Sequence, residues 1–200
     1  NMVDKLLIGL LSNGHVLLEG VPGLAKTLAI RSLSDTVDGD FSRVQFTPDL
    51  LPADVVGTLI YNQKQEQFSV KKGPIFANFV LADEVNRPPP KPQSALLEAM
   101  SEFQVSVDGA SHDLPRPFMV LATQNPVEHE GTYILPESQL DRFALRVEMG
   151  YPPPEDEIRI MRRRDPQKVI ADLKPVLTVP EVLWLQEEVG KIKVDDSVAH

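Results

Sequence analysis

Apolar residues along this chain occur in two patterns. Nearly continuous apolar runs at 15–19, 75–82 and 118–123 are typical of strands that are buried on both faces of a parallel sheet. The segments 25–34 and 92–102 repeat apolar residues at helical spacing instead. Strands that alternate with helices predict a three-layer α/β domain built around a parallel sheet.

Shorter apolar segments complete the predicted core. Residues 42–46 and 143–147 read as two more strands, which gives a central parallel sheet of five strands. Further helices are predicted at 3–12, at 138–141 and at 181–189.

Two β-hairpins are predicted as insertions into the alternating pattern. Residues 58–61 and 67–70 are short β-like pieces in the polar interval between Leu50 and Gly73. Residues 105–114 form the second pair, because Asp108-Gly109 marks a tight turn at its centre.

A change of composition at 151–154, Tyr-Pro-Pro-Pro, indicates a linker. We therefore expect residues 1–150 to form the α/β core. Residues 151–200 are expected to form the linker and the first part of an α-helical lid. Because neither end has a lead-in or a closing element, we expect the chain to be a fragment of a longer protein.

Composition narrows the class of protein. The chain has 200 residues, 42% of them hydrophobic, which is enough for a buried core. The chain has no run of 18 apolar residues, so we predict no membrane span, and no signal peptide is visible. The absence of cysteine suits a cytoplasmic protein. A net charge of −9 argues against a general nucleic-acid binder.

The stretch 20–27, Gly-Val-Pro-Gly-Leu-Ala-Lys-Thr, lies between a predicted strand and a predicted helix. This order indicates a phosphate-binding loop, in which backbone N–H groups and the helix N-terminus surround the phosphates. Lys26 would reach the β- and γ-phosphates, and the Thr27 hydroxyl would coordinate Mg²⁺. The alternative is an ordinary strand-turn-helix. The predicted nucleotide-binding residues are Gly20, Val21, Pro22, Gly23, Leu24, Ala25, Lys26, Thr27 and Leu28.

Asp83 and Glu84 follow a buried strand, at the end where open parallel sheets bind ligands. Asp83 would hold Mg²⁺ through water, and Glu84 would act as general base on the attacking water. The alternative is a pair of acids that simply ends a strand.

Two more polar residues are candidates for the same chemistry. Asn125 ends the next buried strand and could hold the attacking water or contact the γ-phosphate, although Asn-Pro also favours a plain turn. Arg142 precedes the last strand and could serve the nucleotide of a neighbouring subunit, or could pair locally with Asp141.

With these residues in place, the chain resembles the MoxR family of AAA+ ATPases, and it also looks similar to magnesium-chelatase motor subunits. The resemblance runs from about residue 5 to 165. The matching segments are HVLLEGVPGLAKT at 15–27, LADEVNR at 81–87, QSALLEAM at 93–100, ATQNP at 122–126 and LPESQLDRF at 135–143.

The resemblance implies roles for these residues. Lys26 and Thr27 match Walker A, and Asp83 and Glu84 match Walker B. By the same likeness, Asn125 matches sensor 1, and Arg142 matches the arginine finger. The hairpins at 57–72 and 104–115 would face a central pore, and sensor 2 would lie beyond His200.

We therefore expect a Mg²⁺-dependent, ATP-hydrolysing and ring-forming ATPase that remodels or activates a protein partner. The resemblance implies a homo-oligomeric ring of six subunits. Family members often act with partners that carry a von Willebrand factor A domain and in metal-cofactor insertion. The alternatives are a nucleic-acid-translocating motor, which would want basic hairpin tips, and a nucleotide-gated binding module.

Overall fold

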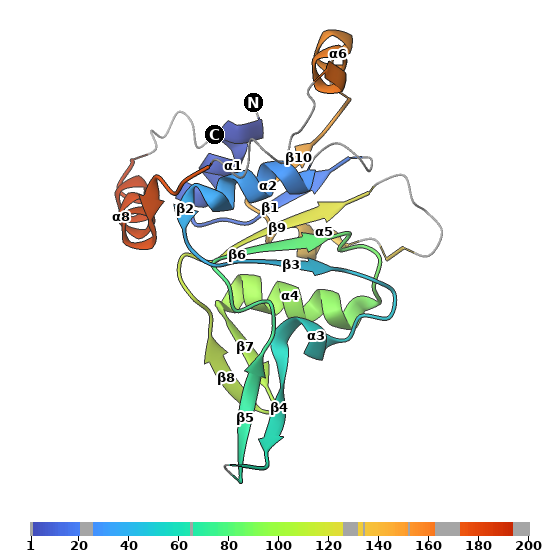
Figure 1. The fold of residues 1–200 in the computed structure, drawn as a ribbon, viewed down its shortest axis with the longest axis vertical. Coiled ribbons are helices and arrows are strands. Elements are labelled where there is room, and N and C mark those ends of the chain that lie inside the picture. The colour runs from blue at the N-terminus through green and yellow to red at the C-terminus, as the bar shows by residue number, and fades with distance from the viewer. Residues whose placement is uncertain are drawn as a thin grey trace.

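Five parallel strands form the central sheet in the computed structural model, in the order β10-β1-β9-β6-β3 (Figure 1). The five-stranded parallel sheet predicted from the sequence is therefore confirmed. The structure describes residues 2–20, 26–64, 66–125, 132–133, 135–151, 153–162 and 173–193. The strands are β1 (Val16–Glu19), β3 (Phe41–Gln45), β6 (Phe79–Asp83), β9 (Met119–Gln124) and β10 (Leu145–Glu148).

Helices cover both faces of this sheet. Figure 1 shows α1 (Met2–Leu11) and α2 (Lys26–Asp35) on one face and α4 (Pro90–Glu102) on the other. The short helices α3 (Pro52–Val56) and α5 (Glu137–Leu140) complete the core. The arrangement is the three-layer α/β fold that the alternating pattern predicts.

Successive strand residues supply two separate apolar layers. Leu17 packs among the α4-side residues, whereas Val16 and Leu18 pack on the side of α1 and α2. All three are 0% exposed. Side chains of a strand alternate between the faces of the sheet, so an unbroken apolar run is what a doubly covered strand requires.

Both predicted hairpins are present and extend away from the α4 side of the core (Figure 1). The longer hairpin pairs β4 (Gly57–Asn62) with β5 (Gln67–Lys72). The shorter one pairs β7 (Gln104–Val107) with β8 (Ala110–Asp113). Its turn residues Asp108 and Gly109 have φ values of 50° and 80°, which explains the Asp-Gly pair at this position.

The strand predicted at 75–82 is shorter and lies later, at Phe79–Asp83. Ile75 is buried without belonging to a strand, so the apolar run overstates the strand. Asn78 explains the boundary: its side chain accepts from the Asp40 amide at 3.0 Å and donates to the Pro117 carbonyl at 2.9 Å. The helix α3, in the interval read as β-like, was not predicted.

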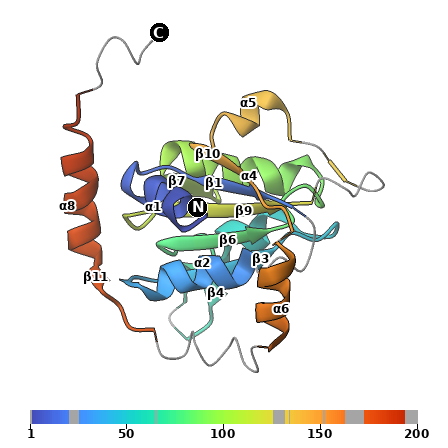
Figure 2. The ribbon, with the colours of Figure 1, turned by 90° about the horizontal axis from the view of Figure 1, so that it is seen from above.

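The segment beyond the core contributes α6 (Pro154–Arg162), β11 (Leu177–Thr178) and α8 (Val179–Val189). Strand β11 pairs in parallel with β2 (Val37–Asp38), and Gln186 of α8 donates to the Leu10 carbonyl of α1 at 2.7 Å. Both contacts lie near the amino ends of the sheet strands. Figure 2 shows α8 and α6 on opposite sides of the molecule. Among the described helices, none is long and apolar enough to cross a membrane.

Candidate functional site

The carboxyl ends of four neighbouring strands lie at one edge of the sheet, and three of them carry predicted site residues. Gly20 follows β1, Asn125 follows β9, and Asp83 and Gln45 end β6 and β3. The Gly20 amide donates to the Gln124 carbonyl at 3.3 Å, which ties the first two ends together. Ligands of open parallel sheets bind at this edge.

Lys26 begins α2 and points its ammonium group back toward the end of β1. Its Nζ donates to the Gly20 carbonyl at 2.7 Å. Partial burial lowers the pKa of Lys26 from its ordinary value, while the negative charges of Asp83 and Glu84 oppose that shift. The ammonium group therefore lies at the end of β1, within electrostatic reach of the acidic pair.

The centre of the predicted phosphate-binding loop lies outside the described residues. Gly20 precedes this gap, and Thr27 and Leu28 follow Lys26 in the first turn of α2. The predicted positions on which the structure is silent are Val21, Pro22, Gly23, Leu24 and Ala25.

Asp83 and Glu84 are connected through Thr123 on the adjacent strand β9. The Glu84 amide donates to the Thr123 hydroxyl at 2.9 Å, and that hydroxyl donates to Asp83 Oδ1 at 3.0 Å. Asp83 and Thr123 are buried, with 6% and 2% of their surfaces exposed. A hydroxyl that accepts one hydrogen bond and donates the other fixes the acidic pair to β9.

Three side chains that the sequence did not assign to the site contact these two carboxylates. Arg43 of β3 donates to Asp83 Oδ2 through Nε at 2.7 Å, with its Nη2 2.6 Å from the same oxygen. Gln45 donates to Glu84 Oε2 at 2.8 Å, and Arg87 Nε lies 3.1 Å from that atom. Arg43 and Gln45 are two positions apart on β3 and therefore share a face. That alternation is a sequence signal, but it becomes useful only once β3 is known to pair with β6.

Glu84 occupies an uncommon backbone conformation. Its φ is 59°, in the left-handed region that non-glycine residues rarely adopt. Such conformations cluster at functional sites, where the surrounding contacts hold them in place. The Thr123 hydroxyl, which accepts from the Glu84 amide, is one of those contacts.

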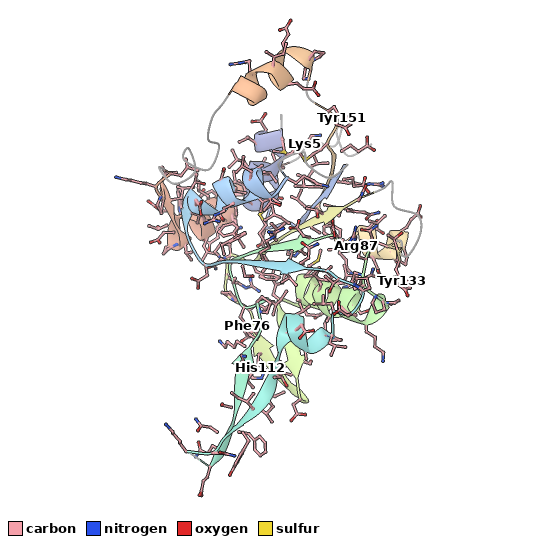
Figure 3. The ribbon with its side chains drawn as sticks, turned by 45° about the vertical axis from the view of Figure 1, so that its right-hand side comes forward. Lys5, Phe76, Arg87, His112, Tyr133 and Tyr151 are labelled. Carbon is pink, nitrogen blue, oxygen red and sulfur yellow. The ribbon has the colours of Figure 1, made fainter. Side chains whose placement is uncertain are left out.

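A buried amide network connects the acidic pair with the segment around Tyr133. The side-chain Nδ2 of Asn86 donates to the Asn125 carbonyl at 3.3 Å, and the backbone carbonyl of Asn86 accepts from the Tyr133 amide at 2.7 Å. Gln93 donates to the carbonyls of Val85 at 3.0 Å and Tyr133 at 3.3 Å. Figure 3 shows Arg87 and Tyr133 close together at this end of the molecule. Asn125 is buried at the end of β9, and its predicted role stays a prediction.

Arg142 lies apart from this cluster in the structure. Its Nη1 donates to the Leu97 carbonyl at 2.6 Å and to the Ser101 hydroxyl at 2.5 Å, both in the last turns of α4. The residue itself is exposed. These two partners are on α4, whereas the sequence offered Asp141 as the local alternative.

The donor set of the site fits a magnesium nucleotide. No group of three His, Cys, Asp or Glu side chains that could hold a metal occurs within the described residues. Thr27 and Asp83 are the residues that would hold a divalent cation here, together with oxygens from a bound phosphate. Mg²⁺ in phosphate sites is held in this way, by few protein oxygens and substrate phosphates.

Comparison with known proteins agrees with the geometry. The sequence model of the ATPase family associated with various cellular activities (AAA) matches residues 15–145. Chaperone MoxR1 of Mycobacterium tuberculosis is 54% identical over 186 residues, which are 93% of this chain and 49% of that protein. The chain belongs to the MoxR family of AAA+ ATPases. This confirms the resemblance drawn from the sequence motifs.

Two further similarities support the MoxR assignment. YeaC of Bacillus subtilis is 52% identical over 192 residues, which cover 96% of this chain and 60% of YeaC. A solved structure from Cytophaga hutchinsonii, described as a candidate ATPase, is 52% identical with a TM-score of 0.87. The similarity covers 98% of this chain and 60% of that one. The chain thus spans about half to three-fifths of the length of these relatives.

Proposed function

We propose that this chain binds and hydrolyses ATP as the nucleotide-dependent core of a ring-forming, chaperone-like ATPase that remodels or activates a protein partner. The observation that carries the proposal is the connected arrangement of Asp83, Thr123 and Glu84 beside Lys26. A lysine near the end of β1 and two acidic side chains at the end of β6 form the set that phosphoryl transfer from a nucleotide requires.

Each residue has a distinct task in this proposal. Lys26 exchanges the Gly20 carbonyl for phosphate oxygens and neutralises their charge. Glu84 takes a proton from the attacking water, and Asn125 orients that water or the terminal phosphate. Mg²⁺, held by Thr27 and Asp83, would stabilise the negative charge that develops on the phosphate oxygens.

Arg142 is proposed to act on the nucleotide of a neighbouring subunit. Its guanidinium lies on α4, away from the Lys26–Asp83 cluster of its own chain. An arginine finger supplied by a neighbour makes hydrolysis depend on assembly, which is the basis for proposing a homo-oligomeric ring. The proposed number of six subunits rests on the resemblance to the family.

The protein partner is proposed from the relatives and from the hairpins. One relative is named a chaperone, and the two hairpins extend away from the core (Figure 1). Tyr61 and Phe68 form an exposed aromatic pair on the longer hairpin, with ring centres 5.0 Å apart. We propose a partner with a von Willebrand factor A domain, with complex maturation or metal-cofactor insertion as the outcome. The absence of cysteine fits a cytoplasmic location, which stays a prediction.

Glu84→Gln tests the proposed chemistry, because it keeps the size and polarity of the side chain but removes the base. We expect ATP binding to persist, while the rate of hydrolysis at saturating Mg²⁺ and ATP falls at least about a hundredfold. Glu102→Gln makes the same chemical change on the exposed end of α4 and should hydrolyse ATP as the unmodified protein does. Hydrolysis that is undiminished in Glu84→Gln would show that Glu84 is not the base.

A further inference from the structure

Arg43 is the residue whose contact with the site is least explained by the proposed hydrolysis. It comes from the edge strand β3 and places both Nε and Nη2 against one oxygen, Asp83 Oδ2, at 2.7 Å and 2.6 Å. The carboxylate is nearly buried, with 9% of its side chain exposed, while the Arg43 side chain is 52% exposed. The arginine therefore covers the solvent side of the carboxylate.

The other oxygen of Asp83 is also occupied. Oδ1 accepts the hydrogen bond from Thr123 on β9, the strand on the opposite side of β6. The carboxylate is thus contacted from both neighbouring strands. A cation that approaches Asp83 Oδ2 meets a guanidinium that already uses this oxygen.

The surrounding charges strengthen this effect. Three cationic side chains, Lys26, Arg43 and Arg87, surround the two carboxylates of Asp83 and Glu84. Positive charge within several ångströms opposes the binding of a further cation, and more strongly in a partly buried site than in water. The arrangement therefore disfavours a divalent ion that arrives without phosphate.

We propose that Arg43 is a positioning residue that sets the divalent-cation affinity of the site. It holds Asp83 Oδ2 while the ion is absent, and it gives up this contact when the ion and the nucleotide bind together. The inference rests on the proposed function, in which Asp83 faces Mg²⁺. Its consequence is that the metal site is available mainly when a nucleotide brings its own negative charge.

The test measures metal affinity rather than hydrolysis. Mn²⁺ serves as the probe and is titrated into the protein in the presence of saturating ADP, with free Mn²⁺ followed by electron paramagnetic resonance. Arg43→Gln removes the competing charge, so its Mn²⁺ affinity should rise about three- to tenfold. Arg43→Lys loses the two-nitrogen contact but retains the competing charge, so its Mn²⁺ affinity should stay within about twofold of the unmodified protein.

Arg146 offers a matched control. It pairs with the nearly buried carboxylate of Glu19 at 2.5 Å, from a neighbouring strand in the same way, and is 58% exposed. Arg146→Gln should leave the Mn²⁺ affinity within about twofold, because Asp83 keeps Arg43. An equal rise in both glutamine variants would assign the effect to overall charge and overturn the proposal. Unchanged or weakened Mn²⁺ binding in Arg43→Gln would overturn it as well.

Asp83→Asn separates this inference from the proposed function. If Asp83→Asn binds Mn²⁺ as the unmodified protein does, the metal site itself is wrong. If Asp83→Asn loses Mn²⁺ but Arg43→Gln does not tighten it, only the role of Arg43 fails.

A second measurement leaves the Arg43–Asp83 ion pair intact. The Nε–H resonance of Arg43, assigned by its absence in Arg43→Lys, is followed by NMR in the unmodified protein. Addition of Mg²⁺ with ADP should move it toward the position of a solvent-exposed arginine. A resonance that stays at its metal-free position would show that Arg43 never leaves Asp83.

Discussion

The hydroxyl of Thr123 donates a hydrogen bond to Asp83 Oδ1 at 3.0 Å, from the end of one strand to the end of the next. The same hydroxyl accepts from the Glu84 amide, so one atom positions both members of the acidic pair. The position of the proposed metal ligand and that of the proposed base therefore depend on a single side chain.

Thr123→Val keeps the shape of this side chain but removes both hydrogen bonds. We expect the free energy of unfolding to fall by about 1–3 kcal/mol, because buried polar groups lose their partner. Hydrolysis should fall about tenfold to a hundredfold, because Glu84 is no longer held in its left-handed conformation. Urea unfolding and steady-state ATPase assays measure the two effects. Thr58→Val, on the exposed hairpin, should change neither quantity. Undiminished hydrolysis in Thr123→Val would mean that the two hydrogen bonds of the Thr123 hydroxyl are dispensable for activity.

Lys26→Ala should greatly weaken ATP binding without unfolding the protein. The ammonium group of Lys26 donates to the carbonyl of Gly20, which follows β1 at the edge of the sheet where the phosphates are expected to bind. Calorimetric titration of ATP measures the loss, and Lys5→Ala, on the exposed face of α1, is the control for removal of one positive charge. Unchanged affinity would remove the assignment of the phosphate-binding loop.

Arg142→Ala should nearly silence hydrolysis and spare ATP binding, since arginine fingers contribute about 10³–10⁵ in rate. Mixing it with Lys26→Ala should restore part of the activity, because one subunit keeps its phosphate-binding loop and the next keeps Arg142. The measurement is a titration of one inactive variant into the other under conditions where rings exchange. Arg159→Ala, on the exposed helix α6, is the control. If mixed rings form and no ratio exceeds the sum of the separate proteins, Arg142 acts only within its own chain.

His15 should make the stability depend on pH. Its Nε2 lies 3.0 Å from the Met100 carbonyl, and its Nδ1 accepts from the Val120 amide at 3.0 Å, which requires the neutral ring with the proton on Nε2. Burial lowers the pKa of His15 from its ordinary value of 6.5, against the raising effect of the Met100 carbonyl. The folded protein therefore binds fewer protons than the unfolded chain as the pH falls below this value.

The free energy of unfolding should accordingly be unaffected by His15 above about pH 6.5 and should decrease below it, by up to about 1.4 kcal/mol per pH unit, until the folded-state pKa is reached. Urea unfolding between pH 4 and 8 (roughly the range in which histidine titrates) measures the slope. His15→Gln should lose the part of the slope that belongs to this ring, whereas His112→Gln should keep it. An identical slope in His15→Gln would contradict the assignment.

The apolar pattern predicted the sheet because its strands are covered on both faces, so that Val16, Leu17 and Leu18 all had to be apolar. It failed at Ile75, which is buried beneath the sheet without joining a strand, because burial and strand pairing are different properties. Helix α3 has only five residues, too few for helical periodicity to show.

The residues of the site were likewise predicted only in part from the sequence. Lys26, Asp83 and Glu84 were predicted because motif spacing and strand ends locate them along the chain. Their roles, and those of Asn125 and Arg142, stay predictions. Arg43 and Gln45 could not be found, because their contacts depend on which strand lies beside β6 and in which register. That information is long-range and is set by the packing of the whole sheet.

The contact between Arg142 and α4 connects its proposed role with a hairpin of its own chain. Its Nη1 donates to Leu97 and Ser101, and α4 leads within a few residues into the hairpin of β7 and β8. The other N–H groups of the guanidinium remain as donors for a second molecule. If the proposed contact with a neighbouring subunit instead draws Nη1 away from α4, it also loosens the root of the hairpin that extends from the donor's surface.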